Sequence, residues 1–148
     1  MMIARLNRWA DVFSKPENSK MIESSLNPYT PQHRPTEIRL KSEKRVLEVD
    51  FDDGKIYSLT AELLRVESPS AEVQGHGPGQ KTIVFGRRHV GIVEVVPVGN
   101  YAIQINFDDL HDTGIYSWDT LYDYGERQDE LWQEYLESLN KLGLSRDP

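Results

Sequence analysis

Hydrophobic and polar residues alternate along the first part of the chain that has a clear periodicity. Apolar side chains occupy every second position of residues 38–40 and 47–51. Strands with one buried and one solvated face show this period of two. The Asp-Asp-Gly sequence at 52–54 predicts a tight turn, because Asp and Gly tolerate positive φ. Residues 55–59 are then expected to return as the partner strand.

The same pattern recurs in the second half of the chain. Residues 90–98 are apolar and β-branched, and residues 101–107 alternate from Tyr101 onwards. The Gly99-Asn100 pair between them predicts a two-residue hairpin turn. A further short strand is expected over residues 115–118.

Helices are expected where the period changes. Thr60 is a suitable N-cap for a short helix over residues 61–66, and Asp119 is a suitable N-cap for a second one. Residues 126–142 have helical spacing, and Gly143 provides a C-terminal stop. The face expected to dock on the sheet carries Leu131, Tyr135, Leu139 and Leu142.

These elements predict an α+β fold, mostly antiparallel β-sheet built from two similar hairpins, with short helices and one longer C-terminal helix. Prolines among polar residues from 16 to 35 indicate an extended linker. We therefore divide the chain into an N-terminal extension and linker (1–33), a folded domain (34–125) and a C-terminal amphipathic helix with its tail (126–148). Residues 68–80 are expected to form a loop.

An internal repeat underlies the two hairpins. Residues 49–58 and 105–117 both contain Phe-Asp-Asp followed by Ile-Tyr-Ser. The first copy has two residues between these motifs, and the second has five, Leu110 to Gly114. A longer loop on a repeated hairpin is a place where function is often located.

Composition excludes several classes of function. The 148 residues include no cysteine, which rules out disulfides, thiolate metal sites and cysteine nucleophiles. A net charge of −7 argues against nucleic-acid binding, and no apolar run is long enough for a membrane span. The N-terminal residues lack the continuous apolar core of a secretory signal. We expect a cytoplasmic protein, with residues 3–13 as an appended amphipathic segment, a targeting helix or an extension upstream of an alternative start at Met21.

The candidate metal ligands are His111, Asp108 and Asp112. Carboxylate oxygen and imidazole nitrogen together suit iron, manganese or zinc. A plain polar turn explains the same residues, because hairpin turns favour Asp for backbone reasons. His76 or His89 would have to approach to complete a site with two histidines.

Other motifs do not define a catalytic centre. Residues 75–82 nearly match a phosphate-binding loop, but Gln80 replaces the required glycine and the following residues 83–85 are β-type. The sequence has no serine in a nucleophile elbow and no zinc-protease motif. The basic clusters at 39–45 and 87–89 are expected to be solvated strand edges, with a phosphate or partner contact as the alternative. Four aromatics are expected to pack in the core or line a ligand wall: Tyr116, Trp118, Tyr122 and Tyr124.

Three segments resemble a bacterial family of unknown function, DUF971, which is similar to the N-terminal domain of gamma-butyrobetaine hydroxylase. They are Pro-Thr-Glu-Ile-Arg-Leu at 35–40, residues 64–77, and His-Asp-Thr-Gly-Ile-Tyr-Ser-Trp at 111–118. The resemblance covers about residues 34–125. It implies a small β-rich domain that occurs alone, before a 2-oxoglutarate oxygenase, or after a P-loop ATPase of iron–sulfur assembly.

The resemblance also implies a zinc site that this chain cannot form. In the hydroxylase, three cysteines and one histidine hold the zinc. His111 matches the histidine, but the loop that would carry the cysteines contains none here (residues 67–73). Either no metal is held, or His111 acts with oxygen ligands such as Asp112 or Glu72 on a harder ion. The oxygenase domain is absent, so its hydroxylation chemistry does not transfer.

Three hypotheses follow. The chain is a small non-catalytic accessory or interaction domain with a protein partner, linked to iron or iron–sulfur proteins. Alternatively, it is a weak metal-binding protein centred on His111, with iron or zinc as the cofactor. The third hypothesis is a small-molecule enzyme with a pocket between Trp118 and the loop at 75–80. We favour the first, and expect neither nucleic acid nor a membrane as partner.

Overall fold

A computed structural model describes residues 31–148. It contains two three-stranded antiparallel sheets, each with its strands in chain order. The first sheet contains β1 (Pro35–Lys41), β2 (Val46–Phe51) and β3 (Ile56–Thr60). The second contains β4 (Ile92–Val98), β5 (Ala102–Phe107) and β6 (Ile115–Ser117). The expected N-terminal amphipathic segment and most of the linker lie outside the described residues.

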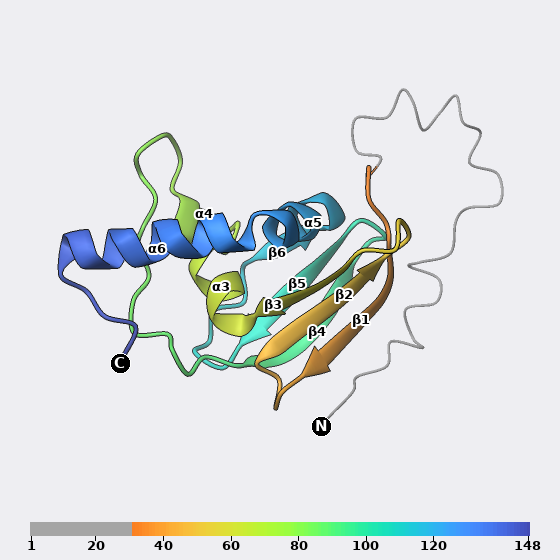
Figure 1. The fold of residues 1–148 in the computed structure, drawn as a ribbon, viewed down its shortest axis with the longest axis horizontal. Helices are drawn as coiled ribbons and strands as arrows, with labels where there is room; N and C mark the ends of the chain where they lie inside the picture. The colour runs from red at the N-terminus through yellow and green to blue at the C-terminus, as the bar shows by residue number, and fades with distance from the viewer. Residues whose placement is uncertain (1–30) are drawn as a thin grey trace.

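Four helices complete the described part of the chain. They are α3 (Ala61–Val66), α4 (Ala71–Gln74), α5 (Trp118–Glu126) and α6 (Gln128–Leu142). Figure 1 shows α5 and α6 running along one side of the strands, with α3 between α6 and the sheets. This arrangement confirms the predicted α+β fold with a longer C-terminal helix.

The two sheets are structural copies of one another. Each first strand is irregular at its start, where Pro35 and Glu37 in β1 correspond to Ile92 and Glu94 in β4. Each second strand ends at the Phe of Phe-Asp-Asp, and the turn that follows is closed by the same two backbone hydrogen bonds. The repeat inferred from the sequence is therefore present, and it extends through three strands in each copy.

Both sheets, α3 and α5 contribute to one hydrophobic core. Burial at alternate positions of the strands explains the period of two in the sequence. The predicted N-cap of α3 is confirmed by the hydrogen bond from the Leu63 amide to Thr60 Oγ1 at 3.1 Å. The best-buried members of the core are Ile38, Leu47, Val49, Leu59, Leu64, Ile92, Ile103, Ile105, Tyr116, Trp118 and Leu121. Tyr116 and Trp118 thus pack in the core, as one of the two sequence interpretations proposed.

The C-terminal helix docks as predicted, with two corrections. Leu131, Tyr135 and Leu139 are buried, and Gly143 ends α6 in the left-handed conformation. Leu142, which shares their spacing, is exposed. The helix expected over 126–142 begins two residues later, at Gln128, because Glu126 is the last residue of the preceding helix α5.

Several local predictions were wrong. Asp119 does not cap α5, since the Thr120 amide donates to Ser117 Oγ instead, and Asp119 accepts hydrogen bonds from the Gln32 and His33 amides. The β4–β5 turn has three residues rather than two, because Val98 pairs with Ala102. That extra residue reverses one position of the expected alternation, so Ala102 is buried and Tyr101 exposed.

Two loop predictions also need correction. The segment 68–80 contains the short helix α4, and residues 83–85 are not part of a strand. In residues 31–148 no helix combines the length and the apolar character needed to cross a membrane.

Candidate functional site

The second copy of the repeat differs from the first immediately after its turn. The Phe51 amide bonds to the Lys55 carbonyl in the first copy, and the Phe107 amide bonds to the His111 carbonyl in the second. Lys55 and His111 therefore occupy equivalent positions. Residues 112–114 are additional in the second copy and lie between His111 and β6. The insertion predicted for 110–114 is thus confined to these three residues.

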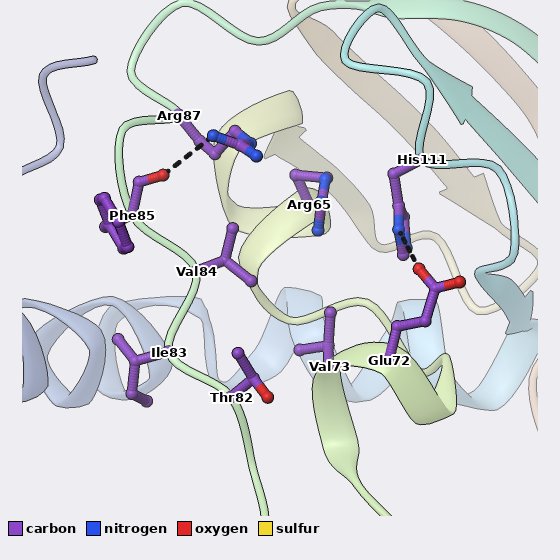
Figure 2. Close-up of a pocket in the computed structure, with 9 residues that line it drawn as sticks. All are labelled: Arg65, Glu72, Val73, Thr82, Ile83, Val84, Phe85, Arg87 and His111. Carbon is purple, nitrogen blue, oxygen red and sulfur yellow. Dashed lines mark hydrogen bonds and ion pairs between the residues drawn. The ribbon is translucent and has the colours of Figure 1, made fainter.

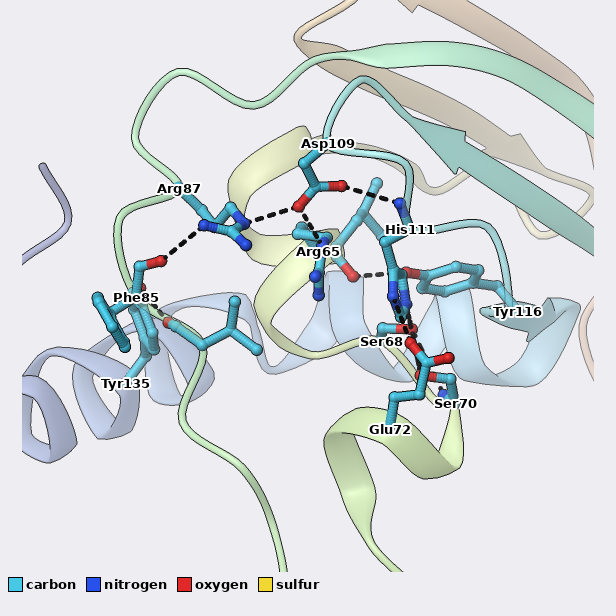
Figure 3. A network of polar contacts seen from close by, with 12 residues as sticks. Arg65, Ser68, Ser70, Glu72, Phe85, Arg87, Asp109, His111, Tyr116 and Tyr135 are labelled. Atoms are coloured by element: carbon cyan, nitrogen blue, oxygen red, sulfur yellow. Dashed lines mark hydrogen bonds and ion pairs between the residues drawn. The ribbon is translucent and has the colours of Figure 1, made fainter. Parts of the chain in front are cut away.

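His111 is buried beside the segment that follows α3. Its Nε2 lies 2.9 Å from Ser68 Oγ and 3.4 Å from Ser70 Oγ, and its Nδ1 lies 3.1 Å from Glu72 Oε2 (Figure 3). Gly114 makes this packing close, because a Cβ there would lie 2.5 Å from Ser68 Oγ. Burial, together with the positive charge of Arg65, lowers the pKa of His111, although Glu72 opposes this.

Within residues 31–148, no hydrogen bond or ion pair joins the His111 ring to the carboxylate of Asp108 or Asp112. The Asp108 amide bonds to the Gly91 carbonyl, and the Asp112 carbonyl accepts a hydrogen bond from Gln104, 2.5 Å away. The carboxylate at His111 is that of Glu72, which the sequence had offered as an alternative ligand. In the described range, 31–148, no three His, Asp or Glu side chains are grouped to hold a metal ion.

The order Ser68, His111, Glu72 has the connectivity of a nucleophile, a base and an orienting acid. Accessibility argues against that chemistry here. The Ser68 side chain is completely buried, and its hydroxyl also hydrogen bonds with Ser70. A nucleophile must reach an electrophilic atom of the substrate. We therefore interpret these contacts as a polar network that fixes the loop after α3 against the second hairpin.

A second polar group lies beside this network. Asp109 Oδ2 accepts hydrogen bonds from Arg65 Nε and Arg87 Nε, both at 2.7 Å, and Asp109 Oδ1 accepts one from the His111 amide at 3.1 Å (Figure 3). Burial opposes ionisation of Asp109. Hydrogen bonds from Arg65, the His111 amide and Arg87, together with the charge of Arg65, outweigh it, so the pKa of Asp109 is lowered. The group of three side chains carries one net positive charge.

Arg65 is unusual within this group. It belongs to α3, in which every residue is buried, and only 10% of its side chain is exposed. Its Nη1 is buried and has no hydrogen-bond partner. A buried guanidinium nitrogen without an acceptor is destabilising, so this atom has an unused capacity to bind an anion.

Arg65 also lines a cavity of about 360 Å³. Figure 2 shows the Arg65 guanidinium between Val84 on one side and His111 on the other, with Glu72 and Val73 below. One wall is apolar and the other is polar. The full lining consists of Arg65, Glu72, Val73, Thr82, Ile83, Val84, Phe85, Arg87 and His111.

Two exposed apolar residues belong to the segments around the cavity: Phe85 is on its lining, and Leu110 precedes His111 in the turn. Phe85 is 52% exposed, and Leu110, between Asp109 and His111 in the turn, is 90% exposed. Arg87 links Phe85 to the turn that carries Leu110, because its Nη1 donates to the Phe85 carbonyl while its Nε donates to Asp109, the residue before Leu110. We call Phe85, Arg87 and Leu110 the docking face.

The backbone conformation of Leu110 is as unusual as its exposure. Its φ is +72°, in the region that favours glycine. The corresponding residue of the first copy is Gly54, with φ of +90° and the same hydrogen bond to the preceding Phe carbonyl. The second copy therefore holds a large apolar side chain in water at a position where the first copy uses glycine.

The remaining sequence candidates have structural partners. Lys81, in the phosphate-loop-like segment, pairs with Glu67 at 2.6 Å, and no helix follows it. Arg39 pairs across the sheet with Glu48 and Asp50, and Lys41 also pairs with Glu48, so these two members of the first basic cluster belong to an ion-pair network. Trp118 is buried in the core, so the cavity beside His111 is not the pocket expected next to Trp118.

Sequence reasoning did not single out Arg65, Ser68, Ser70 or Phe85. Arg65, Ser68 and Ser70 lie in the segment 64–77 that resembles the family, but nothing in it marks these side chains as partners of the second hairpin, which lies more than forty residues away in the sequence. Phe85 lies in an irregular segment without a motif. One signal was available for Leu110. Alignment of Phe-Asp-Asp-Gly with Phe-Asp-Asp-Leu would have revealed a leucine at a glycine position.

Comparison with known proteins agrees with the fold. Residues 38–122 match the family described as gamma-butyrobetaine hydroxylase-like, N-terminal. The chain belongs to this family. No curated protein matches it.

Three solved structures are similar to this member of the family. Two are NMR solution structures with TM-scores of 0.70: one is 44% identical and covers 80% of this chain and 93% of its own, and the other is 46% identical and covers 82% and 91%. The third is a crystal structure of a protein of unknown function of the DUF971 family from Acidithiobacillus ferrooxidans. It is 47% identical, has a TM-score of 0.50, and covers 64% of this chain and 92% of its own.

Proposed function

We propose that this chain is a small non-catalytic accessory module that binds a partner protein through the docking face. Leu110 carries the proposal, since it combines 90% exposure with a positive φ. The left-handed conformation costs a residue with a side chain about 1–2 kcal/mol. Exposure of a leucine gains nothing for folding. Features that destabilise the free protein often have a role in binding.

The charge of the region favours a protein as partner. Arg65 and Arg87 already share Asp109, which leaves one net positive charge beside Phe85 and Leu110. Nucleic-acid binding needs clustered, unneutralised cations, and the chain carries a net charge of −7. An apolar surface with one unit of positive charge is better suited to a protein surface that is apolar and weakly acidic.

The proposal retains the link to iron or iron–sulfur proteins. The support for this link is the family itself, through the fusion to an ATPase of iron–sulfur assembly that the resemblance implies. We likewise propose a cytoplasmic setting, in agreement with the expectation from the sequence. Neither point depends on the geometry of the docking face.

A weak metal site centred on His111 is the second candidate. The observation in its favour is Glu72, whose Oε2 lies 3.1 Å from His111 Nδ1. Both imidazole nitrogens already have hydrogen-bond partners, so a metal such as iron or zinc would have to displace one. Elemental analysis of untagged protein and of the His111→Ala variant tests it. A near-stoichiometric amount of metal in wild type that is lost in the variant would establish the site. The absence of metal from both proteins would exclude it.

The interaction function is tested by differential capture from cells that produce the protein. Wild type, Leu110→Gly and Ile56→Ala are compared, since Ile56 is an exposed apolar residue of the first hairpin, 59% accessible. We expect a defined protein to be retained by wild type and Ile56→Ala and lost with Leu110→Gly. Equal retention by all three variants would contradict the proposal.

A further inference from the structure

The cavity next to the docking face combines two properties that together restrict its ligand. Arg65, almost fully buried, has a nitrogen without an acceptor, and Arg87 stands at the same cavity. Val73, Ile83 and Val84 provide an apolar wall. A ligand that satisfies both sides carries an anionic group attached to an apolar body.

We propose that this cavity binds the free C-terminal carboxylate of the partner polypeptide, together with an apolar last residue. The inference rests on the proposed function and identifies the part of the partner that is bound. The carboxylate accepts hydrogen bonds from the Arg65 and Arg87 guanidiniums. The last side chain packs against Val84 and Ile83, and the preceding residues extend over Phe85 and Leu110.

The charges favour a carboxylate over a phosphate. Arg65, Arg87 and Asp109 together carry one net positive charge, and the 64% exposed Glu72 on the same lining offsets part of it. The site therefore suits at most a singly charged anion, since a dianion would leave a larger excess of negative charge in a partly buried site.

The apolar wall favours a chain end over an acidic side chain. An Asp or Glu side chain brings a carboxylate on a short stem and leaves the wall uncovered. A terminal leucine, valine or phenylalanine brings the carboxylate and an apolar group on the same residue. A cavity of about 360 Å³ has room for such a residue. The partly exposed Phe85 on the lining gives the rest of the peptide a route to the docking face.

Binding requires a local adjustment. Arg65 Nη1 is closed off from solvent in the free protein, so side chains that cover it must shift when the carboxylate enters. The segment 82–85 is a suitable element for this shift, because it belongs to no strand or helix. Three hydrogen bonds hold it: the Thr82 amide donates to the Val73 carbonyl, the Tyr135 hydroxyl donates to the Val84 carbonyl, and Arg87 Nη1 donates to the Phe85 carbonyl.

The test is a titration of the complete, isotope-labelled protein with the peptide acetyl-Ala-Ala-Leu, monitored by NMR chemical shifts. The same peptide with a C-terminal amide, and 4-methylpentanoate, are titrated in parallel. We expect the free acid peptide to bind at least about tenfold more tightly than the amide, because the amide loses the charge-assisted hydrogen bonds. The affected signals should include residues 82–87 and His111.

Arg87→Gln is the informative variant, and Arg88→Gln is its matched control. Both remove one positive charge at adjacent positions, but Arg88 pairs with Asp147 and does not line the cavity. We expect Arg87→Gln to lower the affinity for the free acid peptide at least about fivefold, and Arg88→Gln to leave this affinity unchanged. Both arginines are partners of Asp109, but Arg65→Gln is less suitable, because only 10% of the Arg65 side chain is exposed and its replacement would disturb the fold more than that of Arg87, which is 33% exposed.

Each other outcome overturns the inference. Equal affinities for acid and amide, no binding up to about 10 mM, or equal effects of the two arginine variants would exclude recognition of the carboxylate. Binding of 4-methylpentanoate without binding of the peptide would assign the cavity to a small acid. The proposed function is judged separately, because Leu110→Gly alters the docking face and leaves the cavity lining intact.

Discussion

Replacement of Leu110 by glycine is expected to stabilise the protein. Relief of the left-handed conformation gains about 1–2 kcal/mol. The greater freedom of glycine in the unfolded chain costs about 0.4–1 kcal/mol. The loss of buried surface is negligible, because the side chain is 90% exposed. The free energy of unfolding should therefore rise by about 0.5–1 kcal/mol, which corresponds to roughly 0.3–0.5 M in the urea midpoint.

Two further variants isolate the backbone effect. Leu110→Ala removes most of the side chain and keeps the strained φ, so its stability should remain close to that of wild type. Gly54→Leu creates the same strain in the first copy, where a Cβ meets no atom within 4 Å, and should lower stability by about 0.5–1 kcal/mol. A Leu110→Gly protein that is less stable than wild type would refute the reasoning, since it would mean that the leucine supports the fold.

Three other predictions concern the fold and the network around it. Tyr135→Ala should lower the free energy of unfolding by about 3–5 kcal/mol in urea melts, because Tyr135 is buried and its hydroxyl donates to the Val84 carbonyl at 2.8 Å. A change within error would show that α6 is not docked. Burial and then Arg65 lower the pKa of His111, so wild type should lose stability as the pH falls below about 6.5, and His111→Gln should flatten this dependence between about pH 5 and 7; parallel curves would contradict it. Hydrogen bonds from Lys41 and then Arg39 lower the pKa of Glu48 to about 2, so Glu48→Gln should lower the free energy of unfolding by about 1–3 kcal/mol at pH 7. This difference from wild type should shrink as the pH falls from about 4.5 towards 2, and a constant difference in urea melts across that range would argue against the lowered pKa.

The strands could be predicted from the sequence because their burial follows the period of two. Leu47, Val49 and Phe51 alternate with polar residues, and all three are buried. The position of the helix caps was less predictable. Asp119 is a good capping residue, but Ser117 lies one position before the helix and Asp119 instead binds backbone amides near residue 33. Local preference alone could not decide between two capping residues that lie two positions apart.

The candidate site could be predicted only in part. The second hairpin turn was identified, and His111 within it is buried in a polar network. The partners of His111 were uncertain because Ser68 and Glu72 come from a different part of the chain. Arg65 was not identified at all, since a basic residue in a short helix carries no signal of burial. Its significance depends on Asp109 and on the cavity, which exist only in the folded chain.

The central claim is that the docking face contacts a partner protein. The most direct measurement places a photo-crosslinking amino acid at Leu110 or Phe85 in living cells, with Ile56 and Leu142 as exposed control positions. We predict a discrete adduct of one protein from positions 110 and 85, and none from positions 56 and 142. No adduct at position 110, or the same adducts from all four positions, would contradict the account.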